Sequence, residues 1–422
     1  MHSIFFRPTD TTKKRSAVWI VLLTALLVSC GGNKTLLPPS SQQQVFPTIR
    51  SGAPVSADYF GMHLQCVTVS WCSNGTVPYP TGMKFSGIRL WDSAYWGSIE
   101  PGRDVYNWGE LDSLIGTATA NGVSDFIFTF GNPPTWALNP DGSVNQGDAD
   151  EFLTTLVRRE CGTIQYYETW NEANLPSSWT GTQTQLITLA QHFYQTVRAN
   201  CPAAKVLTPS VNTLTYADSR TWLQWWLQQG IPYDIIAFHG YTQPEAIQDD
   251  MRWLRGIVGL NVDVWDTEGS WGKEGTLTEA QEANWLMRAY IMQAASGVSR
   301  FYWYAYGSCS WGSLYGPSCG GSSDHQQGMR EAGIAYGTVS KWLLGATIGA
   351  CSNDDEQTWS CTLTRPKGYE GVIMWNMSSS VQVQIPAQSF VQHRDWQNTA
   401  NPLGTTVTVS PMPILIENEN AS

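Results

Sequence analysis

Two glutamates in this sequence stand where their carboxyl groups could do chemistry. Glu172 lies in the segment YYETWNEANLPSSW, and Glu268 lies in the segment DVWDTEG. Each follows a run of residues typical of a buried β-strand, where an acid is costly unless it is paired or has a function. If the fold brought the two carboxyl groups together, one could act as a nucleophile while the other donated and accepted a proton.

The runs that contain these acids belong to a regular series of short predicted strands. Most of the strands are separated by segments of helical period, such as residues 278–297, which open on a capping box formed by Thr278 and Gln281. Strands that alternate with helices predict a parallel sheet, and eight strands close a (β/α)₈ barrel. We therefore predict an α/β fold in which residues 56–345 form a TIM barrel. The predicted strands are residues 58–64, 87–91, 125–130, 164–170, 205–209, 234–241, 263–268 and 300–306.

The C-terminal part of the chain has a different pattern. Over residues 350–418, short β-type runs alternate with turn residues and show no helical period. We predict that residues 346–422 form a small antiparallel β-sandwich domain packed on the barrel. The run QVFPTIR (44–50) is expected to add a strand to it.

The ends of the predicted barrel strands collect polar and aromatic side chains. In a (β/α)₈ barrel the reacting groups lie at the C-terminal ends of the strands. Two acids that face each other across a cleft of aromatic rings fit the hydrolysis of a glycosidic bond, and a retaining enzyme keeps its two carboxyl groups about 5–5.5 Å apart. For either glutamate alone, a solvated helix cap or a loop acid is the simpler interpretation, but the pair on predicted strands four and seven favours chemistry. The residues at these strand ends are His63, Arg89, Trp91, Asn132, Asn171, Glu172, Asn212, His239, Tyr241, Glu268 and Trp303.

The sequence around both glutamates resembles that of a known group of enzymes. The segments TWNEAN and DVWDTEG together resemble the clan A retaining glycoside hydrolases, and YYETWNEANL is similar to the F-E-x-W-N-E-x-N segment of glycoside hydrolase family 39. The resemblance covers roughly residues 56–345. It implies that Glu172 is the acid/base and Glu268 the nucleophile of a retaining glycosidase. We then expect the negative charge of Glu268 to raise the pKa of Glu172.

Further roles follow from the same resemblance, one residue at a time. Asn171 would hydrogen-bond the 2-hydroxyl of the sugar, a contact that tightens in the transition state. Arg89 would keep the nucleophile ionised. His239 and Tyr241 would line the subsite and hydrogen-bond the nucleophile.

The resemblance also implies an aromatic platform on the last strand. Trp303 would form the floor under the reacting sugar. Glu168 lies four residues before Glu172 and therefore deeper in the barrel, where a buried acid must be paired. We interpret Glu168 as structural, with Arg89 as its expected partner. The remaining residues expected to bind the substrate are His63, Trp91 and Asn132.

The composition agrees with a carbohydrate substrate. The 422 residues include 35 acids and 24 bases, and the net charge of −11 argues against binding to nucleic acid. The chain has 21 Trp and 17 Tyr residues, whose apolar rings with a polar edge suit hydroxylated ligands such as an oligo- or polysaccharide. One competing hypothesis is a non-catalytic carbohydrate-binding lipoprotein on a degenerate barrel, and the presence of both glutamates favours the enzyme. An inverting or transglycosylating enzyme is the other competing hypothesis.

The first thirty residues are typical of an export signal. Lys13, Lys14 and Arg15 lie just before the apolar run AVWIVLLTALLVS, which is too short to span a bilayer. The run leads to Cys30 through Leu-Val-Ser, which resembles a bacterial lipobox, and a cleaved signal without a lipid is the alternative. Residues 31–55, rich in Pro, Ser and Gln, would form a tether. We predict export and lipid anchoring at Cys30 to a bacterial membrane, in the periplasm or at the cell surface.

The other eight cysteines form an even set, as expected in an oxidising compartment. Eight cysteines allow about 105 connectivities, so proximity in sequence guides the choice. The loops at 66–72 and 307–324, with Trp71 and Trp311, would build subsites on the catalytic face. No spacing of Cys and His suggests a metal site, and no cofactor is expected. The predicted pairs are Cys66–Cys72, Cys161–Cys201, Cys309–Cys319 and Cys351–Cys361.

Lipid anchoring can be tested by one substitution. Replacing Cys30 with Ser removes the thiol that accepts the lipid, so we expect the variant to be released in soluble form or to remain unprocessed. Membrane fractionation and the mass of the N-terminal peptide check this. Unchanged membrane association together with normal processing would contradict the lipid anchor.

Overall fold

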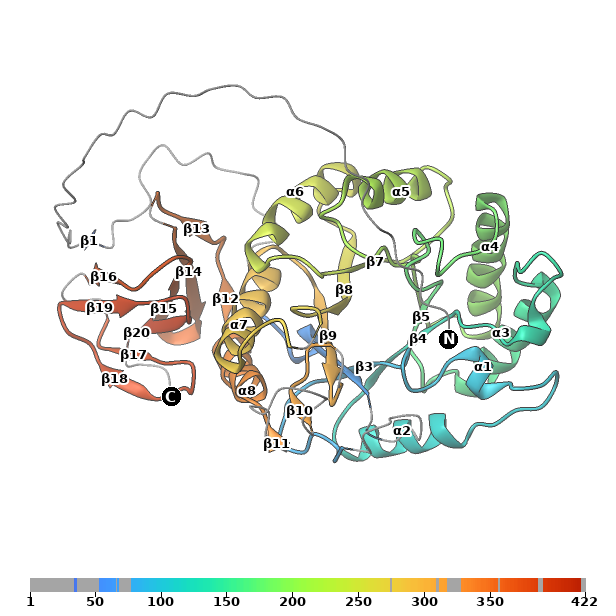
Figure 1. The fold of residues 1–422 in the computed structure, drawn as a ribbon, viewed down its shortest axis with the longest axis horizontal. Coiled ribbons are helices and arrows are strands. Elements are labelled where there is room, and N and C mark those ends of the chain that lie inside the picture. Colours follow the sequence, from blue (N-terminus) through green and yellow to red (C-terminus); the bar gives the residue numbers. More distant parts are fainter. Residues whose placement is uncertain are drawn as a thin grey trace, which may run out of the picture. The chain divides into compact units, whose positions relative to one another are not determined.

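A closed barrel of eight parallel strands forms the larger part of the structure, as predicted (Figure 1). The computed structural model describes residues 34–35, 53–65, 67, 77–273, 275–308, 311–316, 328–355, 357–385 and 390–418. The barrel closes because its last strand pairs in parallel with its first. In order, the strands are β2 (Phe60–Leu64), β3 (Gly87–Arg89), β4 (Asp125–Thr129), β5 (Tyr166–Glu168), β6 (Lys205–Leu207), β7 (Ile235–His239), β8 (Asp263–Gly269) and β9 (Arg300–Tyr306).

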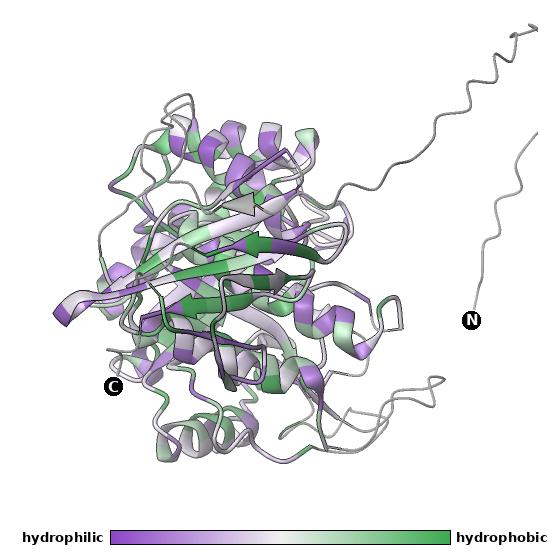
Figure 2. Cartoon of the chain, turned by 90° about the vertical axis from the view of Figure 1, so that its left-hand side faces the viewer, coloured by the Kyte–Doolittle hydropathy of each residue, from purple (hydrophilic) through white to green (hydrophobic). Residues whose placement is uncertain are grey.

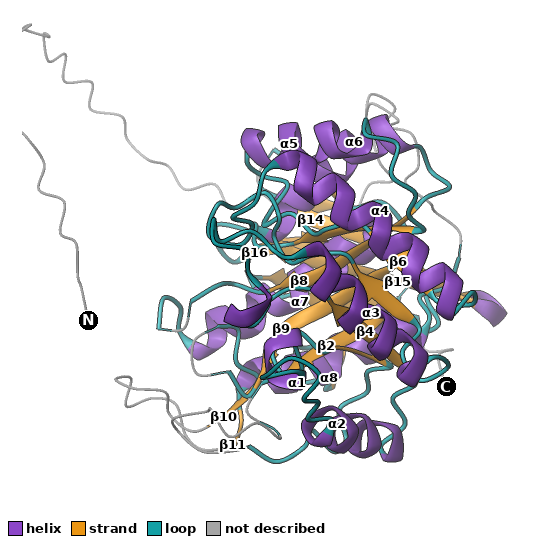
Figure 3. Ribbon diagram, turned by 90° about the vertical axis from the view of Figure 1, so that its right-hand side faces the viewer, coloured by secondary structure: helices purple, strands orange, loops and turns teal. Residues whose placement is uncertain are grey.

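Helices follow most of the strands and cover the outside of the barrel (Figure 3). The capping box expected at Thr278 and Gln281 is present at the start of the helix between β8 and β9. The helices α3 and α4 each bury one apolar face, which is the amphipathic pattern that the sequence showed, whereas α7 is buried on nearly all sides. The helices are α1 (Trp96–Ile99), α2 (Gly109–Ala120), α3 (Gln146–Glu160), α4 (Gln183–Asn200), α5 (Ala217–Leu227), α6 (Ile247–Val258), α7 (Glu279–Ala295) and α8 (Glu331–Leu343).

The inside of the barrel changes character along its axis. A separate apolar cluster made by inward-facing strand residues fills one layer: Ile127, Leu207, Ile235, Ala237, Trp265 and Tyr302. Arg300, the first residue of β9, lies over Trp265 at 4.3 Å and closes the N-terminal end. Further along the strands the buried side chains include polar ones, among them Arg89 and Glu168. The apolar layer therefore separates the N-terminal end from the polar C-terminal end, where a site is expected.

The C-terminal region forms the predicted antiparallel sandwich (Figure 2). A seven-stranded sheet has the order β12-β14-β15-β20-β17-β18 with β13 beside β14, and a second sheet has the order β1-β16-β19. Side chains from both sheets share one apolar core, which includes Met374, Val383, Val407 and Ile416. The strands are β1 (Lys34–Thr35), β12 (Thr347–Ile348), β13 (Ser352–Asn353), β14 (Thr358–Arg365), β15 (Tyr369–Asn376), β16 (Val381–Gln384), β17 (Gln392–Arg394), β18 (Ala400–Pro402), β19 (Thr406–Val409) and β20 (Ile414–Glu417).

Buried polar contacts join the sandwich to the barrel. Glu245, in the loop after β7, accepts hydrogen bonds from Arg288 of α7 and from the indole of Trp375 in β15, both at 2.9 Å. Gln248 of α6 donates to the carbonyl of Cys351 at 2.8 Å. These contacts seat the sandwich on α6 and α7.

Two of the predicted disulfides are present. Cys161–Cys201 joins the ends of α3 and α4, just before β5 and β6, and Cys351–Cys361 lies in the sandwich. Within the described ranges, no helix is both long and apolar enough to cross a membrane. The predicted signal with Cys30, the strand QVFPTIR and the pairs Cys66–Cys72 and Cys309–Cys319 lie outside the described residues.

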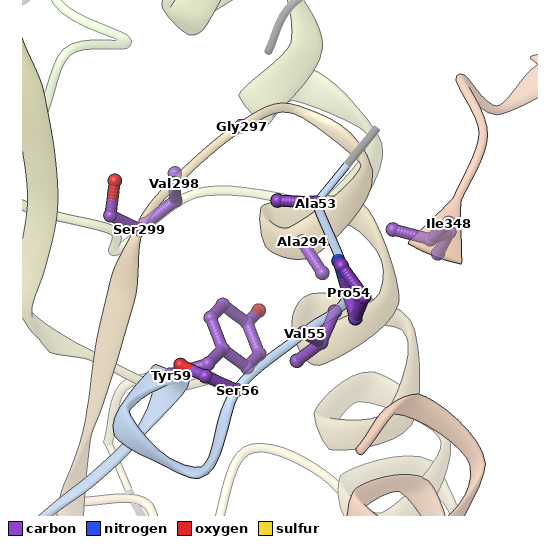
Figure 4. Close-up of a pocket in the computed structure, with 10 residues that line it drawn as sticks. All are labelled: Ala53, Pro54, Val55, Ser56, Tyr59, Ala294, Gly297, Val298, Ser299 and Ile348. Atoms are coloured by element: carbon purple, nitrogen blue, oxygen red, sulfur yellow. The ribbon is translucent and has the colours of Figure 1, made fainter. Parts of the chain in front are cut away.

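A cavity of about 230 Å³ lies near the N-terminal ends of β2 and β9 (Figure 4). It is lined mainly by small and apolar residues from 53–56, the end of α7 and Ile348. Its ionisable lining residue, Tyr59, donates its hydroxyl to the carbonyl of Tyr290 at 2.7 Å. This cavity therefore offers packing and no evident chemistry. A short pair of strands, β10 (Tyr315–Gly316) and β11 (Gly328–Met329), lies after β9.

Candidate active site

Arg89, the last residue of β3, is buried at the C-terminal end of the barrel. Its Nε donates to Glu168 at 2.6 Å, its Nη1 to Glu268 at 2.8 Å and its Nη2 to the Oδ1 of Asn171 at 2.7 Å. Burial alone lowers the pKa of Arg89, but the charges of Glu168 and Glu268 raise it more, so the group stays charged. The expected contacts of Arg89 with both acids are confirmed.

Glu168 is a structural acid, as interpreted from the sequence. It is fully buried, and besides Arg89 it accepts hydrogen bonds from Thr129 at 2.6 Å and from Thr267 at 3.1 Å. Burial raises the pKa of Glu168, but the charges of Arg89 and His239 and the hydrogen bonds from Arg89 and Thr129 together lower it more, and the result lies below the usual value. Both of its oxygens accept hydrogen bonds from protein donors, so this acid links β5 to β3, β4 and β8.

Glu268, on β8, is held through both carboxylate oxygens. Oε2 accepts from Arg89, and Oε1 accepts from the hydroxyl of Tyr241 at 2.7 Å. Burial and the charge of Glu268 raise the pKa of Tyr241 well above its ordinary value, so the phenol remains a donor. Donors on both oxygens fix the plane of the carboxylate.

Glu172 follows β5 in a backbone conformation that is uncommon for a residue other than glycine. Its φ is +48°, in the left-handed region, and its N–H donates to the Oγ of Ser210 at 3.1 Å. Its side chain is 22% exposed, against 10% for that of Glu268. Glu172 is therefore the more accessible of the two acids.

His239, at the end of β7, lies between the two glutamates. We expected it to hydrogen-bond the nucleophile together with Tyr241; Tyr241 does so, but for His239 the expectation is wrong. Its Nδ1 lies 3.0 Å from Glu172 Oε1, whereas its Nε2 lies 3.8 Å from Glu268 Oε2 and has no hydrogen-bond partner among the described residues. Arg89 and Tyr241 already occupy the oxygens of Glu268, and the ring pairs with the other carboxylate.

The expected direction of the Glu172 pKa is also wrong. Burial raises the pKa of Glu172, but the hydrogen bond and the charge of His239 lower it more, so it lies below its usual value. Burial lowers the pKa of His239, but the charge of Glu268 and the contact with Glu172 raise it more. The two opposite shifts favour placing the proton of the Glu172–His239 pair on the imidazole, beside an ionised Glu172.

The two acids are close enough to act on one atom. One donor atom from each of Glu172, His239 and Glu268 lies within 4.8 Å of the others. Three such donors could also hold a metal ion, but the oxygens of Glu268 are bonded to Arg89 and Tyr241, and His239 is paired with Glu172. Protein contacts therefore account for this cluster.

Trp303 does not form the floor that we expected. It is fully buried, its indole donates to the carbonyl of Gly312 at 2.7 Å, and it packs on Trp285 and Tyr290 of α7. Side chains alternate along a strand, so Trp303 faces the helices and Tyr304 faces the barrel. The run RFYWYAY has aromatic residues on both faces, and alternation alone did not mark the inward one.

Tyr304 and Asp92 are site residues that sequence reasoning missed. The hydroxyl of Tyr304 donates to Asp92 Oδ1 at 3.0 Å, and Asp92 Oδ2 lies 2.9 Å from Nδ1 of His63. His63 is fully buried, and its Nε2 lies 2.9 Å from the carbonyl of Thr267. Both nitrogens of His63 are therefore engaged by protein, and it orients Asp92 instead of offering a free nitrogen to the substrate. The position of Asp92, three residues after Arg89, was the available signal.

Trp91 and Asn132 lie beside the cluster, where the sequence predicted them. The ring of Trp91 lies 5.8 Å from the guanidinium of Arg89. Asn132 is exposed after β4, with a φ of +47°. Both residues line one cavity, together with Asp92.

The loop expected at 307–324 is described only in part. Trp311 is 40% exposed, and its ring lies 5.6 Å from that of Tyr241, the donor to Glu268. Trp311 thus presents an aromatic surface at the catalytic end. The loop 66–72 with Trp71 lies, except for residue 67, outside the described residues.

Comparison with known proteins agrees with this geometry. The family model for the glycosyl hydrolase catalytic core matches residues 104–321, about half of the chain. The match includes β5 and β8, the strands that position both glutamates.

Solved structures of similar fold include three glycosidases. A family 39 glycoside hydrolase from Bacteroides cellulosilyticus WH2 has a TM-score of 0.65 and 15% identity, over 80% of this chain and 76% of that one. A glucosidase from Croceicoccus marinus has a TM-score of 0.61 and 14% identity, over 88% and 98%. A GH39 β-xylosidase from Caulobacter crescentus has a TM-score of 0.58 and 16% identity, over 88% and 98%. At these identities the likeness shows the fold.

Proposed function

We propose that this chain, which belongs to the glycosyl hydrolase catalytic core family, is a retaining glycosidase that cleaves O-glycosidic bonds of an oligo- or polysaccharide. Glycoside hydrolase activity follows from the family. The observation that supports retention is the distance of at most 4.8 Å between carboxylate oxygens of Glu172 and Glu268. Inverting enzymes hold their acids about 6.5–9.5 Å apart to admit a water, whereas retaining enzymes need about 5–5.5 Å.

Glu268 acts as the nucleophile. Its carboxylate is fixed by Arg89 and Tyr241, so it meets the anomeric carbon without reorganising. The bond from the anomeric carbon to the glycosidic oxygen breaks as the bond to Glu268 forms, and the leaving oxygen takes a proton from Glu172. The product is a glycosyl-enzyme ester.

The Glu172–His239 pair supplies that proton. The pair carries one proton in the 3.0 Å hydrogen bond between Nδ1 of His239 and Oε1 of Glu172. When this proton moves to the carboxylate, Glu172 becomes the general acid. In the second half of the reaction Glu172 takes a proton from water, the water oxygen attacks the anomeric carbon, and Glu268 is released. The pair then holds one proton again.

Asn171 fits the role of a transition-state contact. Its Oδ1 accepts from Arg89, which leaves its amide N–H groups as donors. A 2-hydroxyl of the reacting sugar can accept such a hydrogen bond, which orients it. The O–H of that hydroxyl then becomes a stronger donor as positive charge develops on the ring. The solved structures of similar fold include a β-xylosidase and a glucosidase, so aryl β-xylosides and β-glucosides are the first substrates to screen.

The two glutamate roles predict different azide products. Glu172→Ala should lower kcat on an unactivated glycoside by about 10²–10⁴-fold. With an activated aryl β-glycoside it should still form the glycosyl-enzyme, stall there and be rescued by azide as the β-glycosyl azide. Glu268→Ala should form no glycosyl-enzyme and give the inverted azide. NMR of the azides and intact-mass analysis check this.

Two outcomes would contradict these roles. A retained azide from Glu268→Ala would reverse them. Near-parent activity of both alanine variants on a natural glycoside would remove the pair from the mechanism and favour a different site or a binding function.

The shared proton predicts a shift in the pH profile. The pair keeps its proton up to the raised pKa of His239, so the alkaline limb of kcat/KM should lie above the ordinary histidine value of about 6.5. His239→Asn keeps a donor near Glu172 but stores no proton, so this limb should move to lower pH. Rates with an aryl glycoside that needs no protonation, measured by release of the phenol, serve as the control. An unmoved alkaline limb would show that His239 does not store the proton.

A further inference from the structure

The loops after β3 and β4 form a hollow beside Arg89, which lies 5.8 Å from the ring of Trp91. A cavity of about 610 Å³ opens there, within the size range of small-ligand sites. The rings of Trp91 and Tyr95 supply apolar faces, and Asp92, Asn132 and Thr135 supply polar edges. Such a mixture suits a sugar, whose ring faces are apolar and whose edges are hydroxylated.

The wall of this cavity depends on a close backbone contact. A Cβ atom at Gly131 would lie 2.9 Å from the ring of Trp91, and the φ of Gly131 is +149°, so a side chain there would displace the tryptophan. Asn132 follows in the left-handed region and accepts a hydrogen bond from the N–H of Gly97 at 3.1 Å. The turn after β4 thus places Trp91 and Asn132 on the same cavity.

The contacts around the acids show which part of the substrate would reach this cavity. Arg89 touches Trp91 and also holds Glu268 and Asn171, the groups that would contact the sugar retained on the enzyme. Glu172, which would protonate the leaving group, is held instead by Ser210 and His239, at the ends of β6 and β7. The cavity therefore lies on the side of the retained sugar.

We propose that this cavity binds a second sugar unit of the glycone, so that the enzyme prefers substrates with at least two units on the non-reducing side of the cleaved bond. The proposal rests on the proposed glycosidase function. It assigns Tyr95 and Thr135 to substrate recognition together with Trp91 and Asn132.

Matched aryl glycosides test the preference. We expect kcat/KM to be at least about tenfold higher for 4-nitrophenyl β-xylobioside than for the β-xyloside, or for the β-cellobioside than for the β-glucoside, as expected when a new contact of about 1.4 kcal/mol is added. Tyr95→Ala removes an aromatic wall, and Thr135→Trp fills the cavity; both should bring the ratio toward one. Tyr216→Ala, at a 63% exposed tyrosine before α5, is the matched control and should leave the ratio unchanged.

The failure of this proposal differs from failure of the glycosidase assignment. A parent ratio near one, or a ratio that neither variant changes, overturns the second subsite while the enzyme remains a glycosidase. If no aryl glycoside is cleaved, calorimetry of xylobiose and cellobiose against xylose and glucose decides. If disaccharides bind more tightly than monosaccharides and Tyr95→Ala abolishes the difference, the sugar-binding role of the cavity is supported without the glycosidase activity. If disaccharides bind no more tightly than monosaccharides, or do not bind, the sugar-binding role is overturned.

Asp266 gives a second, independent inference, because no step above uses this buried acid. It lies two residues before Glu268, is fully buried, and contacts Gln293 of α7. Its Oδ1 accepts from the N–H groups of Gly240 at 2.9 Å and of Glu268 at 3.2 Å, and its Oδ2 accepts from Gln293 at 2.5 Å. A Cβ atom at Gly240 would lie 1.9 Å from Oδ2, so only glycine fits between His239 and Tyr241.

The geometry points to Asp266 as a positioning residue that sets the spacing between the ends of β7 and β8. Oδ1 of Asp266 accepts hydrogen bonds from the backbone N–H groups of Glu268 and of Gly240, which lies between His239 and Tyr241. This carboxyl therefore fixes Glu268, His239 and Tyr241 relative to one another. Burial raises the pKa of Asp266 to about 7, so a neutral isostere suits the site.

Two substitutions of similar size test this role. Asp266→Asn keeps the Oδ1 acceptor and should retain most of kcat, whereas Asp266→Leu should lower kcat on the order of 10²-fold with KM changed little. Gln293→Met removes only the anchor on Oδ2 and should lower kcat severalfold in a chain that still folds. Asp263→Asn, at the other end of β8, is the control. Loss of thermal stability without loss of kcat in the folded Gln293→Met and Asp266→Leu proteins would overturn the positioning role.

Discussion

The buried guanidinium of Arg89 is the contact on which the catalytic end depends. Arg89 ends β3 and joins this strand to two others. Its acceptors are Glu168 at the end of β5, Asn171 in the loop after β5, and Glu268 on β8. A planar group with five donors can serve three acceptors in fixed directions, which an ammonium on a flexible stem does not do. An unpaired charge at this depth would cost several kcal/mol, so the strand register that satisfies Arg89 is also the register that assembles the site.

The charges around Arg89 suit the chemistry of a sugar cation. Two carboxylates, Glu168 and Glu268, face one guanidinium, while Glu172 and His239 carry opposite charges that cancel. The cluster therefore holds a net negative charge in a largely buried setting. This negative charge would attract the positive charge that develops at an anomeric carbon in the transition state.

The sequence predicted the architecture well because the strand-like runs and the helical periods were both clear. All eight barrel strands, the sandwich and the capping box of α7 are where these patterns indicated. It also indicated the pairing of Arg89 with Glu168 and the contact of Tyr241 with Glu268. It failed for Trp303 because alternation defines two faces without saying which is inward. It failed for His239 and for the pKa of Glu172 because the partner of a ring nitrogen depends on which oxygens Arg89 and Tyr241 already occupy.

The strand ends, more than the strands, decide the final geometry. Glu172 and Asn132 both follow barrel strands in the left-handed region, at +48° and +47°, where a non-glycine residue costs of order 1–3 kcal/mol. A backbone hydrogen bond holds each residue in this conformation. The N–H of Glu172 donates to Ser210 Oγ, and the carbonyl of Asn132 accepts from the N–H of Gly97. These turns end the strand alternation, so Glu172 reaches His239 and Asn132 reaches the cavity beside Trp91. Alternation along a sequence can place an acid at a strand end, but such a turn decides which groups it meets.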